Sequence, residues 1–205
     1  GIQIGDMIAP KAQSRLSENK KYLIGKALDD RVGCVVMANV LNNLAHYSLK
    51  NIEVVGIATV QEEVGTRGSK VGAKKVRGDI NFVLDVADGK DTPKAASLKT
   101  RILGQGPGIC LYDKTALAQM DLADFVQNIA NEKNIPYQFD QFTGGGTDAG
   151  SVQLTEGKPT LTISLPVRYC HSWHSQVNIS DCENAVNLLT ESILRLDECG
   201  GELIE

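Results

Sequence analysis

The chain contains three continuous apolar runs that are rich in β-branched residues and bounded by glycine or charged residues. They are Val54–Val60, Ile80–Val86 and Thr160–Pro166. Runs of this length with little polar alternation are typical of strands that are covered on both faces of a sheet. We therefore expect three buried strands at the centre of the fold.

Segments with helical periodicity lie between and around these runs. Apolar side chains recur at spacings of three and four residues in three stripes: Gly33, Met37, Val40, Leu41 and Leu44; Leu122, Phe125, Val126 and Ile129; and Ala185, Leu188, Leu189, Ile193 and Leu196. The third helix is expected to begin at a capping box, Ser180-Asp-Cys-Glu183. Alternating strands and helices predict an α/β sandwich around a largely parallel sheet.

Composition and charge exclude several classes of protein. The 205 residues are 42% hydrophobic and 22% charged with a net charge of −4, which is typical of a globular domain without affinity for nucleic acid. No apolar run approaches the roughly 20 residues of a membrane span, and residues 1–20 lack the order of a signal peptide. We therefore expect a soluble cytoplasmic protein that does not bind membranes. The cysteines are odd in number and scattered, which predicts reduced thiols that mostly fill the core: Cys34, Cys110, Cys170, Cys182 and Cys199.

Potential metal ligands stand at the carboxyl ends of the three runs. Glu62-Glu63 follows the first run, Asp85 closes the second, and His171 follows the third, while Asp29-Asp30 precedes the first helix. Taken singly, each has an ordinary explanation as a solvated turn, an N-cap or a core histidine. Ligands in sheets of this kind bind beyond the carboxyl ends of the strands, so the joint placement favours a metal site at one sheet edge.

Carboxylate oxygens and imidazole nitrogens suit zinc and neighbouring divalent ions. A hydrolytic site with two such ions also needs one free carboxylate as a general base toward a water whose pKa the metal lowers to about 7. The adjacent residues Glu62 and Glu63 point in different directions, so one can bind an ion while the other faces the water. The pattern predicts metal-dependent hydrolysis.

Five motifs carry a family resemblance in order and at similar spacing. They are Gly25–Gly33 (GKALDDRVG), Gln61–Gly65 (QEEVG), Val83–Val86 (VLDV), Gly145–Ala149 (GGTDA) and Arg168–Ser172 (RYCHS). Together they cover about residues 25–198 and resemble the tetrahedral aminopeptidases. Members of that family are described variously as glutamyl aminopeptidases, deblocking aminopeptidases or cellulase-like proteins.

The resemblance implies a three-layer sandwich of the zinc-exopeptidase type and a role for each candidate ligand. Asp29 would bridge two metal ions and be followed by a cis peptide bond, and Glu62 would be the general base. Glu63 and His171 would bind one ion and Asp85 the other. The ions would be zinc or cobalt, with manganese as a further candidate.

Seven other positions are expected to line the substrate pocket or to support the ligands: Asp30, Arg31, Gly145, Gly146, Thr147, Asp148 and Arg168. The glycine-rich loop lacks the Lys-Ser/Thr of a nucleotide-binding loop. His174 follows three residues after His171, but the resemblance gives it no role, so we expect a surface or pocket residue. Trp173 departs from the family pattern and is a candidate for shaping the specificity pocket.

The front of the chain is expected to differ from the rest. Gly1–Pro10 has the pattern of a short edge strand, and the resemblance implies that residues 1–24 are the tail of an inserted β-rich dimerisation domain, with residues 25–205 the catalytic domain. It also implies a longer parent protein whose upstream His-x-Asp motif supplies a fifth ligand and whose dimers form a dodecamer. His46 is the histidine before Glu62, and its place in a helix indicates a surface role. We expect this chain alone to be inactive.

Three functions are compatible with these patterns. The first is a metal-dependent aminopeptidase acting on peptides, and the second is a truncated, non-catalytic relative that serves as an assembly or binding module. The third is a glycoside hydrolase, which needs two carboxyl groups about 5–9 Å apart across a sugar. Adjacent residues such as Glu62 and Glu63 do not naturally supply that arrangement.

Overall fold

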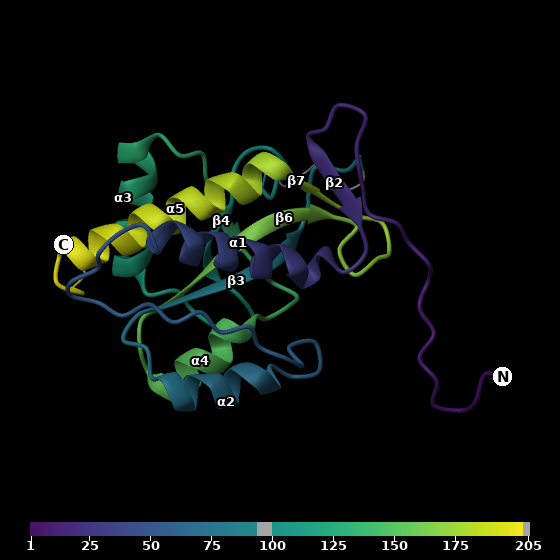
Figure 1. The fold of residues 1–205 in the computed structure, drawn as a ribbon, viewed down its shortest axis with the longest axis horizontal. Helices are drawn as coiled ribbons and strands as arrows, with labels where there is room; N and C mark the ends of the chain where they lie inside the picture. The colour runs from purple at the N-terminus through teal and green to yellow at the C-terminus, as the bar shows by residue number, and fades with distance from the viewer. Residues whose placement is uncertain (94–99, 203–205) are drawn as a thin grey trace.

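A computed structural model describes residues 1–93 and 100–202 and arranges them in three layers around one sheet (Figure 1). The strands are β1 (Arg15–Leu16), β2 (Tyr22–Gly25), β3 (Asn81–Asp88), β4 (Gly108–Tyr112), β5 (Gln138–Gln141), β6 (Thr160–Arg168) and β7 (Ser175–Asn178). The helices are α1 (Leu28–Leu44), α2 (Arg67–Val76), α3 (Met120–Lys133), α4 (Asp148–Glu156) and α5 (Ile179–Glu198). Helices α1, α3 and α5 cover one face of the sheet and α2 and α4 cover the other. The predicted α/β three-layer sandwich is confirmed.

Strand β6 forms the centre of the core because it alternates apolar and small polar residues that are all buried. Leu161, Ile163 and Leu165 are fully buried in the main apolar cluster, which includes side chains of α1, α3 and α5. On the opposite face, Thr162 contacts Thr147 at the start of α4. The two-residue period of the strand thus separates a dry face from a hydrogen-bonded one.

The sheet is mixed, so the expectation of a largely parallel sheet is wrong. β3 pairs with β6 and β4 with β5 in parallel, whereas the pairs β1–β2, β2–β7, β4–β6 and β6–β7 are antiparallel. A parallel neighbour needs a crossover of about a dozen residues or more, but only residues 169–174 connect β6 to β7. That short turn forces β7 to run back along β6.

The predicted strands over Ile80–Val86 and Thr160–Pro166 are confirmed as β3 and β6, but Val54–Val60 is not a strand. Its backbone is irregular, and Val55, Ile57 and Val60 are 51%, 41% and 68% exposed. A strand exists only where a neighbour satisfies its backbone groups, and no strand of the described residues pairs with this segment. The segment still leads directly to Glu62.

The three predicted helices are confirmed as α1, α3 and α5. The start predicted for α5 is wrong, because the N-cap is Asn178, whose side chain accepts a 3.0 Å hydrogen bond from the Ser180 amide. Asparagine is among the strongest N-cap residues, so it displaces the serine two positions later. None of the described helices combines the length and apolarity needed to cross a membrane.

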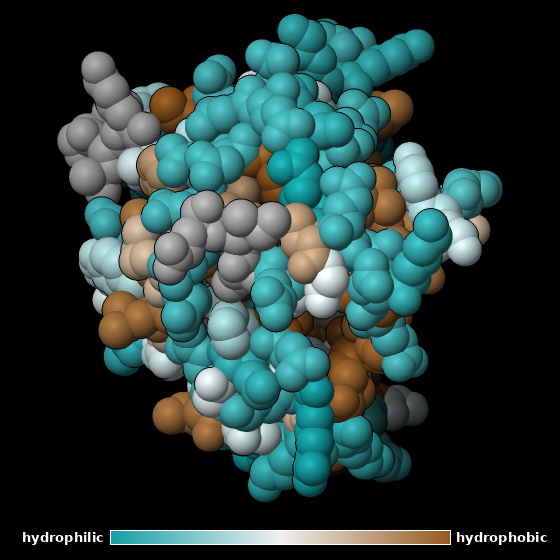
Figure 2. Space-filling view, turned by 90° about the vertical axis from the view of Figure 1, so that its left-hand side faces the viewer, coloured by the Kyte–Doolittle hydropathy of each residue, from teal (hydrophilic) through white to brown (hydrophobic). Residues whose placement is uncertain are grey.

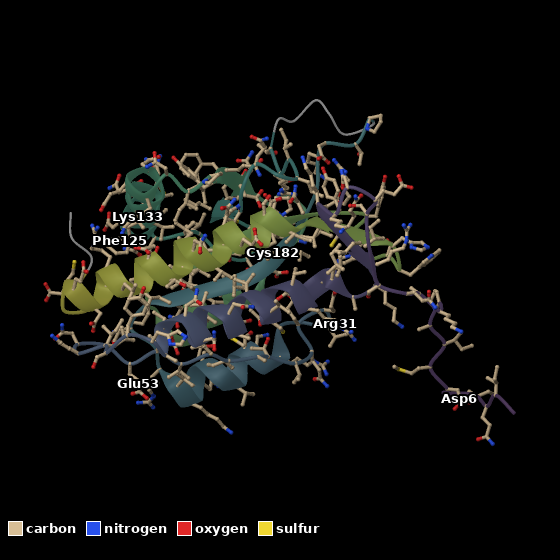
Figure 3. The ribbon with its side chains drawn as sticks, turned by 45° about the horizontal axis from the view of Figure 1, so that its top comes forward. Asp6, Arg31, Glu53, Phe125, Lys133 and Cys182 are labelled. Carbon is tan, nitrogen blue, oxygen red and sulfur yellow. The ribbon has the colours of Figure 1, made fainter. Side chains whose placement is uncertain are left out.

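The N-terminal residues lie apart from the layered body. Gly1–Pro10 contains no strand, so the predicted edge strand is wrong, and Asp6 lies on a tail that extends from the fold (Figure 3). Ordered pairing begins at the β1–β2 hairpin, which joins the sheet through β7. The assignment of residues 1–24 to a separate domain stays a prediction.

Candidate metal centre

Asp29 lies at the entrance to α1 and is the meeting point of the candidate ligands. Its backbone is not helical (φ −81, ψ 112), and the peptide bond to Asp30 is cis, as the family resemblance implies. Asp29 Oδ2 lies 2.9 Å from His171 Nε2 and 3.5 Å from Cys170 Sγ. The start of the first helix and the turn after β6, more than a hundred residues apart in sequence, therefore converge on one oxygen.

Asp30 has two neighbours of different kinds. Its Oδ1 accepts a 3.1 Å hydrogen bond from the Gly33 amide, so this residue caps the regular part of α1. A Cβ at Gly33 would lie 2.2 Å from Asp30 Oδ2, which makes glycine necessary for this approach. Asp30 also offers an oxygen to a cluster with Asp29 and Asp85, so capping and membership of the site coexist.

Two donor clusters share Asp29. In one, ligand atoms of Asp29, Asp30 and Asp85 lie within 4.8 Å of one another, and in the other those of Asp29, Cys170 and His171 do. Asp85 reaches the first cluster from within β3, where its Oδ1 accepts a 2.7 Å hydrogen bond from the Val86 amide. A carboxylate common to two clusters is the arrangement that two neighbouring cations require.

Glu62 and Glu63 differ in exposure, although they are adjacent. The amides of Gly65 and Thr66 donate to the Glu62 carbonyl and form a tight turn. Glu62 is half-buried, whereas the exposed Glu63 carries Oε1 to 3.8 Å from His171 Nε2. Glu63 lines a hollow of about 420 Å³ together with Ala27, Asp29, His171, Ser172 and Ser175.

Burial and crowding of like charges raise the pKa values of several carboxyl groups here. Desolvation and then the charges of Asp148, Glu63 and Asp29 raise the pKa of Glu62 to about 7, which the charge of His171 partly opposes. Desolvation raises the pKa of Asp30 to about 7, against the hydrogen bond from Gly33, and it holds the pKa of Asp85 well above its usual range. Clustered carboxylates with imidazole suit zinc-type divalent cations, so the residues present fit a metal centre.

Asp148 ties the segment that carries Glu62 to the start of α4. Its two oxygens accept hydrogen bonds from Thr59 Oγ1 at 2.6 Å and Ser69 Oγ at 2.7 Å. A further contact joins Thr66 Oγ1 to Ser151 Oγ. The irregular segment before Glu62 is therefore held by a side-chain hydrogen bond at Thr59, and the start of α2 after Glu62 by two more, at Thr66 and Ser69.

A buried carboxylate that sequence reasoning missed, Asp113, holds the other side of the α4 start. It accepts from the Thr147 amide at 3.1 Å and from Thr147 Oγ1 at 2.8 Å, and Thr147 in turn caps α4 by accepting from the Ala149 amide. Asp113 also accepts from the Thr115 amide, which is the local turn that the sequence Asp-x-Thr could have indicated. Its distant link to Thr147 has no such local signal.

The remaining predicted positions lie around this core of the site. A Cβ at Gly146 would lie 2.6 Å from Thr115, and Gly145 accepts from the Lys114 amide, so the glycine loop packs on residues 113–115. Arg168 forms a two-pronged pair with Asp91, at 2.8 and 2.6 Å, and braces the segment after β3. Arg31 is exposed on α1 (Figure 3).

The other two histidines lie outside the donor clusters, whereas one of the five cysteines belongs to one of them. His174 is exposed beside Trp173, with ring centroids 6.1 Å apart, and His46 lies beyond the far end of α1. All five cysteines are free thiols, as predicted, but Cys34 is exposed and Cys170 contacts Asp29, so core filling describes only some of them. Burial and the Asp29 charge raise the pKa of the Cys170 thiol. The position of Cys170 next to the predicted ligand His171 was the sequence feature that could have indicated its place in the site.

Comparisons with known proteins agree with the fold and show the family. A glutamyl aminopeptidase from Lactococcus lactis is 35% identical over 198 residues, which is 96% of this chain and 54% of the relative. A TET aminopeptidase from a marine sediment archaeon of the Thaumarchaeota is 36% identical, with a TM-score of 0.90 over 98% of this chain and 57% of that chain. The TET1 peptidase of Pyrococcus horikoshii, which can assemble into a tetrahedron or a large octahedral shell, is 32% identical, with a TM-score of 0.77 over 88% of this chain and 52% of that chain.

The chain spans about half the length of the curated relatives it matches, from 52% to 57%. The sequence profile of one family, described as M42 glutamyl aminopeptidase, matches residues 1–188. The chain therefore belongs to the M42 glutamyl aminopeptidase family.

Proposed function

We propose that the protein carrying this chain is a metal-dependent aminopeptidase, a hydrolase that removes N-terminal residues from peptides through a centre of two divalent ions. The observation that carries the proposal is the sharing of Asp29 by two donor clusters at one edge of the sheet. Membership of an aminopeptidase family supports the reaction class.

In this proposal each side chain of the centre has one task. Asp29 bridges the ions, Glu63 and His171 hold the first ion, and Asp85 holds the second. Zinc and cobalt suit this donor set, and manganese is a further candidate. When bound, the ions polarise the scissile carbonyl and lower the pKa of the attacking water.

Glu62 is the general base of the proposed reaction. Its carboxyl is half-buried beside the charges of Glu63 and Asp29, and a carboxylate in that position can accept and return a proton. Glu62 takes a proton from the water as its oxygen attacks the carbonyl carbon, and passes the proton to the leaving nitrogen as the C–N bond breaks. Asp148 keeps the segment of Glu62 in place through Thr59.

Assembly is part of the proposal. We infer a cytoplasmic homo-oligomer in which dimers build a dodecamer, with residues 1–24 belonging to the dimerisation domain. Two observations support it: a relative assembles into a tetrahedron or an octahedral shell, and the N-terminal tail exposes the large apolar residues Ile2, Ile4, Met7 and Ile8.

Removal and return of metal tests the proposal. The natural gene product is dialysed against a chelator, reloaded with zinc, cobalt or manganese, and assayed with aminoacyl-anilides and with matched substrates whose amino group is acetylated. We expect activity on free amino termini to disappear and return, with the acetylated substrates uncleaved. Anilide cleavage that survives chelation would overturn a metal-dependent mechanism. The absence of anilide cleavage with every metal would leave glycoside hydrolysis, which two carboxyl groups perform without metal, as the alternative.

A further inference from the structure

Cys170 lies in the turn between β6 and β7, where the backbone brings two adjacent side chains to one target. Tyr169 and His171 both have left-handed backbones, with φ of 57° and 60°. Cys170 Sγ and His171 Nε2 consequently reach the same atom, Asp29 Oδ2, at 3.5 and 2.9 Å. Successive residues ordinarily point in different directions, so this turn gathers a sulfur, a nitrogen and an oxygen at one point.

The distance between Cys170 Sγ and Asp29 Oδ2 is that of neighbouring ligands around a tetrahedral ion. Zinc binds sulfur at about 2.3 Å and nitrogen or oxygen at about 2.0–2.2 Å, which places neighbouring ligand atoms roughly 3.4–3.6 Å apart. The observed Sγ–Oδ2 distance is 3.5 Å, and all three atoms lie within 4.8 Å of one another. The shorter Nε2–Oδ2 distance of 2.9 Å is that of a hydrogen bond, and a small rotation of the His171 ring would lengthen it.

We propose that Cys170 is a thiolate ligand of the ion held by Asp29 and His171. This inference rests on the proposed metal centre and adds a donor to it. As the sulfur–metal bond forms, the S–H bond breaks and its proton leaves to solvent, so binding of the ion releases a proton. With Asp29, His171 and Glu63, Cys170 would make four protein donors, and the attacking water would take a fifth position, which catalytic zinc sites can accommodate.

A thiolate changes which ion the centre prefers. Sulfur donors select zinc and other thiophilic ions, whereas an all-oxygen and imidazole set also accepts manganese. Cys170 should therefore bias the Asp29–His171 position toward zinc, cobalt or cadmium. Loss of the sulfur is expected to weaken zinc binding at least about tenfold and manganese binding much less.

Cobalt substitution tests the ligand directly, because thiolate bound to cobalt(II) gives a near-ultraviolet charge-transfer band that oxygen and nitrogen ligands do not. Visible d–d bands report bound cobalt independently of sulfur. The experiment compares the natural gene product with its Cys170→Ser and Cys170→Ala variants. Cys199→Ser is the matched control, since this half-buried thiol caps the far end of α5, away from the start of α1 (Figure 1).

We expect the charge-transfer band in the wild-type protein and in Cys199→Ser, and its loss in both Cys170 variants while the visible bands persist. A circular dichroism spectrum of each variant checks its fold. Visible bands without the charge-transfer band in the wild-type protein would overturn the thiolate and leave the metal centre standing, and so would a band that survives in Cys170→Ser. If no cobalt bound at all, the metal centre and the thiolate would fall together.

Discussion

Two polar hollows among the described residues lie at opposite ends of α1, and they differ in charge balance. The first is the metal centre, and the second is a groove of about 690 Å³ lined by Asn43, His46, Tyr47, Lys133, Ile135, Asn187, Thr190 and Glu191. In the groove, Lys133 Nζ lies 2.8 Å from Glu191 Oε2. Figure 2 looks at the end of the molecule where α1 and α5 finish, and most residues on this face are hydrophilic.

At the proposed metal centre, by contrast, the neighbours of each carboxylate are mostly other carboxylates. Six acidic residues crowd together there: Asp29, Asp30, Glu62, Glu63, Asp85 and Asp148. Burial and this crowding raise the pKa values of Asp30, Glu62 and Asp85, a cost that a stable fold accepts where function requires it. Charge imbalance, and not the size of a hollow, therefore distinguishes the candidate metal centre from the groove.

The largest expected effect is a loss of turnover without a loss of metal, which distinguishes a general base from a metal ligand. Glu62→Gln removes the proton acceptor but keeps the shape of the side chain, so turnover of an aminoacyl-anilide should fall by roughly 10²–10⁴-fold with metal content unchanged. Steady-state kinetics and metal analysis of the same preparation measure both quantities. Full activity in Glu62→Gln would remove the residue from this role.

The next effect distinguishes the two ion positions. Glu63→Gln and Asp85→Asn each take a donor from one position only, so each should weaken one ion by at least about tenfold and leave the other in place. Metal content after stepwise dialysis gives the number of ions that remain. A variant that loses both ions together would show that its residue is shared by the two positions.

A fall of stability with rising pH should appear only while the centre is free of metal. The folded pKa values of Asp30, Glu62 and Asp85 are raised above their unfolded values, so the folded state holds more protons between about pH 4 and pH 7. Stability must therefore fall as the pH rises through that window. The lowered pKa values of Asp91 and Asp197 act only below it.

Calorimetric unfolding of chelator-treated protein checks this sign. We expect a higher melting temperature near pH 5.5 than near pH 8, and a smaller difference in Asp85→Asn. Saturating zinc should reverse the trend, because ions bind the deprotonated carboxylates. A melting temperature of the metal-free protein that rises steadily with pH would contradict the proposed crowding of charge.

The smallest effects belong to the groove. His46→Ala and Lys133→Ala remove polar groups from an exposed hollow whose charges are paired, so metal content and turnover should stay unchanged. Parallel assays of these variants with Glu63→Gln provide the contrast. Loss of an ion in the His46→Ala variant would show that His46 is a metal ligand, although it lies at the end of α1 opposite the proposed centre.

Much of the fold could be predicted from the sequence, because the spacing of apolar residues determines the element type where that element is buried against the core. β3, β6 and the three helices follow their apolar runs and stripes. Val54–Val60 has the same composition but no strand of the described residues to pair with, and a strand depends on its neighbour. The antiparallel pairing of β6 with β7 likewise follows from the length of one turn, which apolar pattern does not encode.

The site was predictable to the extent that its residues adjoin the apolar runs and the start of the first helix. Asp29, Asp85 and His171 converge as the order of the runs indicated. Asp113 and Cys170 were missed because their partners, Thr147 and Asp29, are distant in sequence and only the folded chain brings them together. The roles assigned to the ligands stay predictions until metal binding is measured.

Both proposed ion positions depend on Asp29 as the carboxylate that they share. Calorimetric titration of zinc into the metal-free natural gene product, beside its Asp29→Asn variant, measures this directly. We predict two binding events in the wild-type protein and a loss of affinity in both for Asp29→Asn, since removing a bridging charge leaves two cations repelling across a short gap. Weakening of only one event, with the other unchanged, would contradict a shared Asp29.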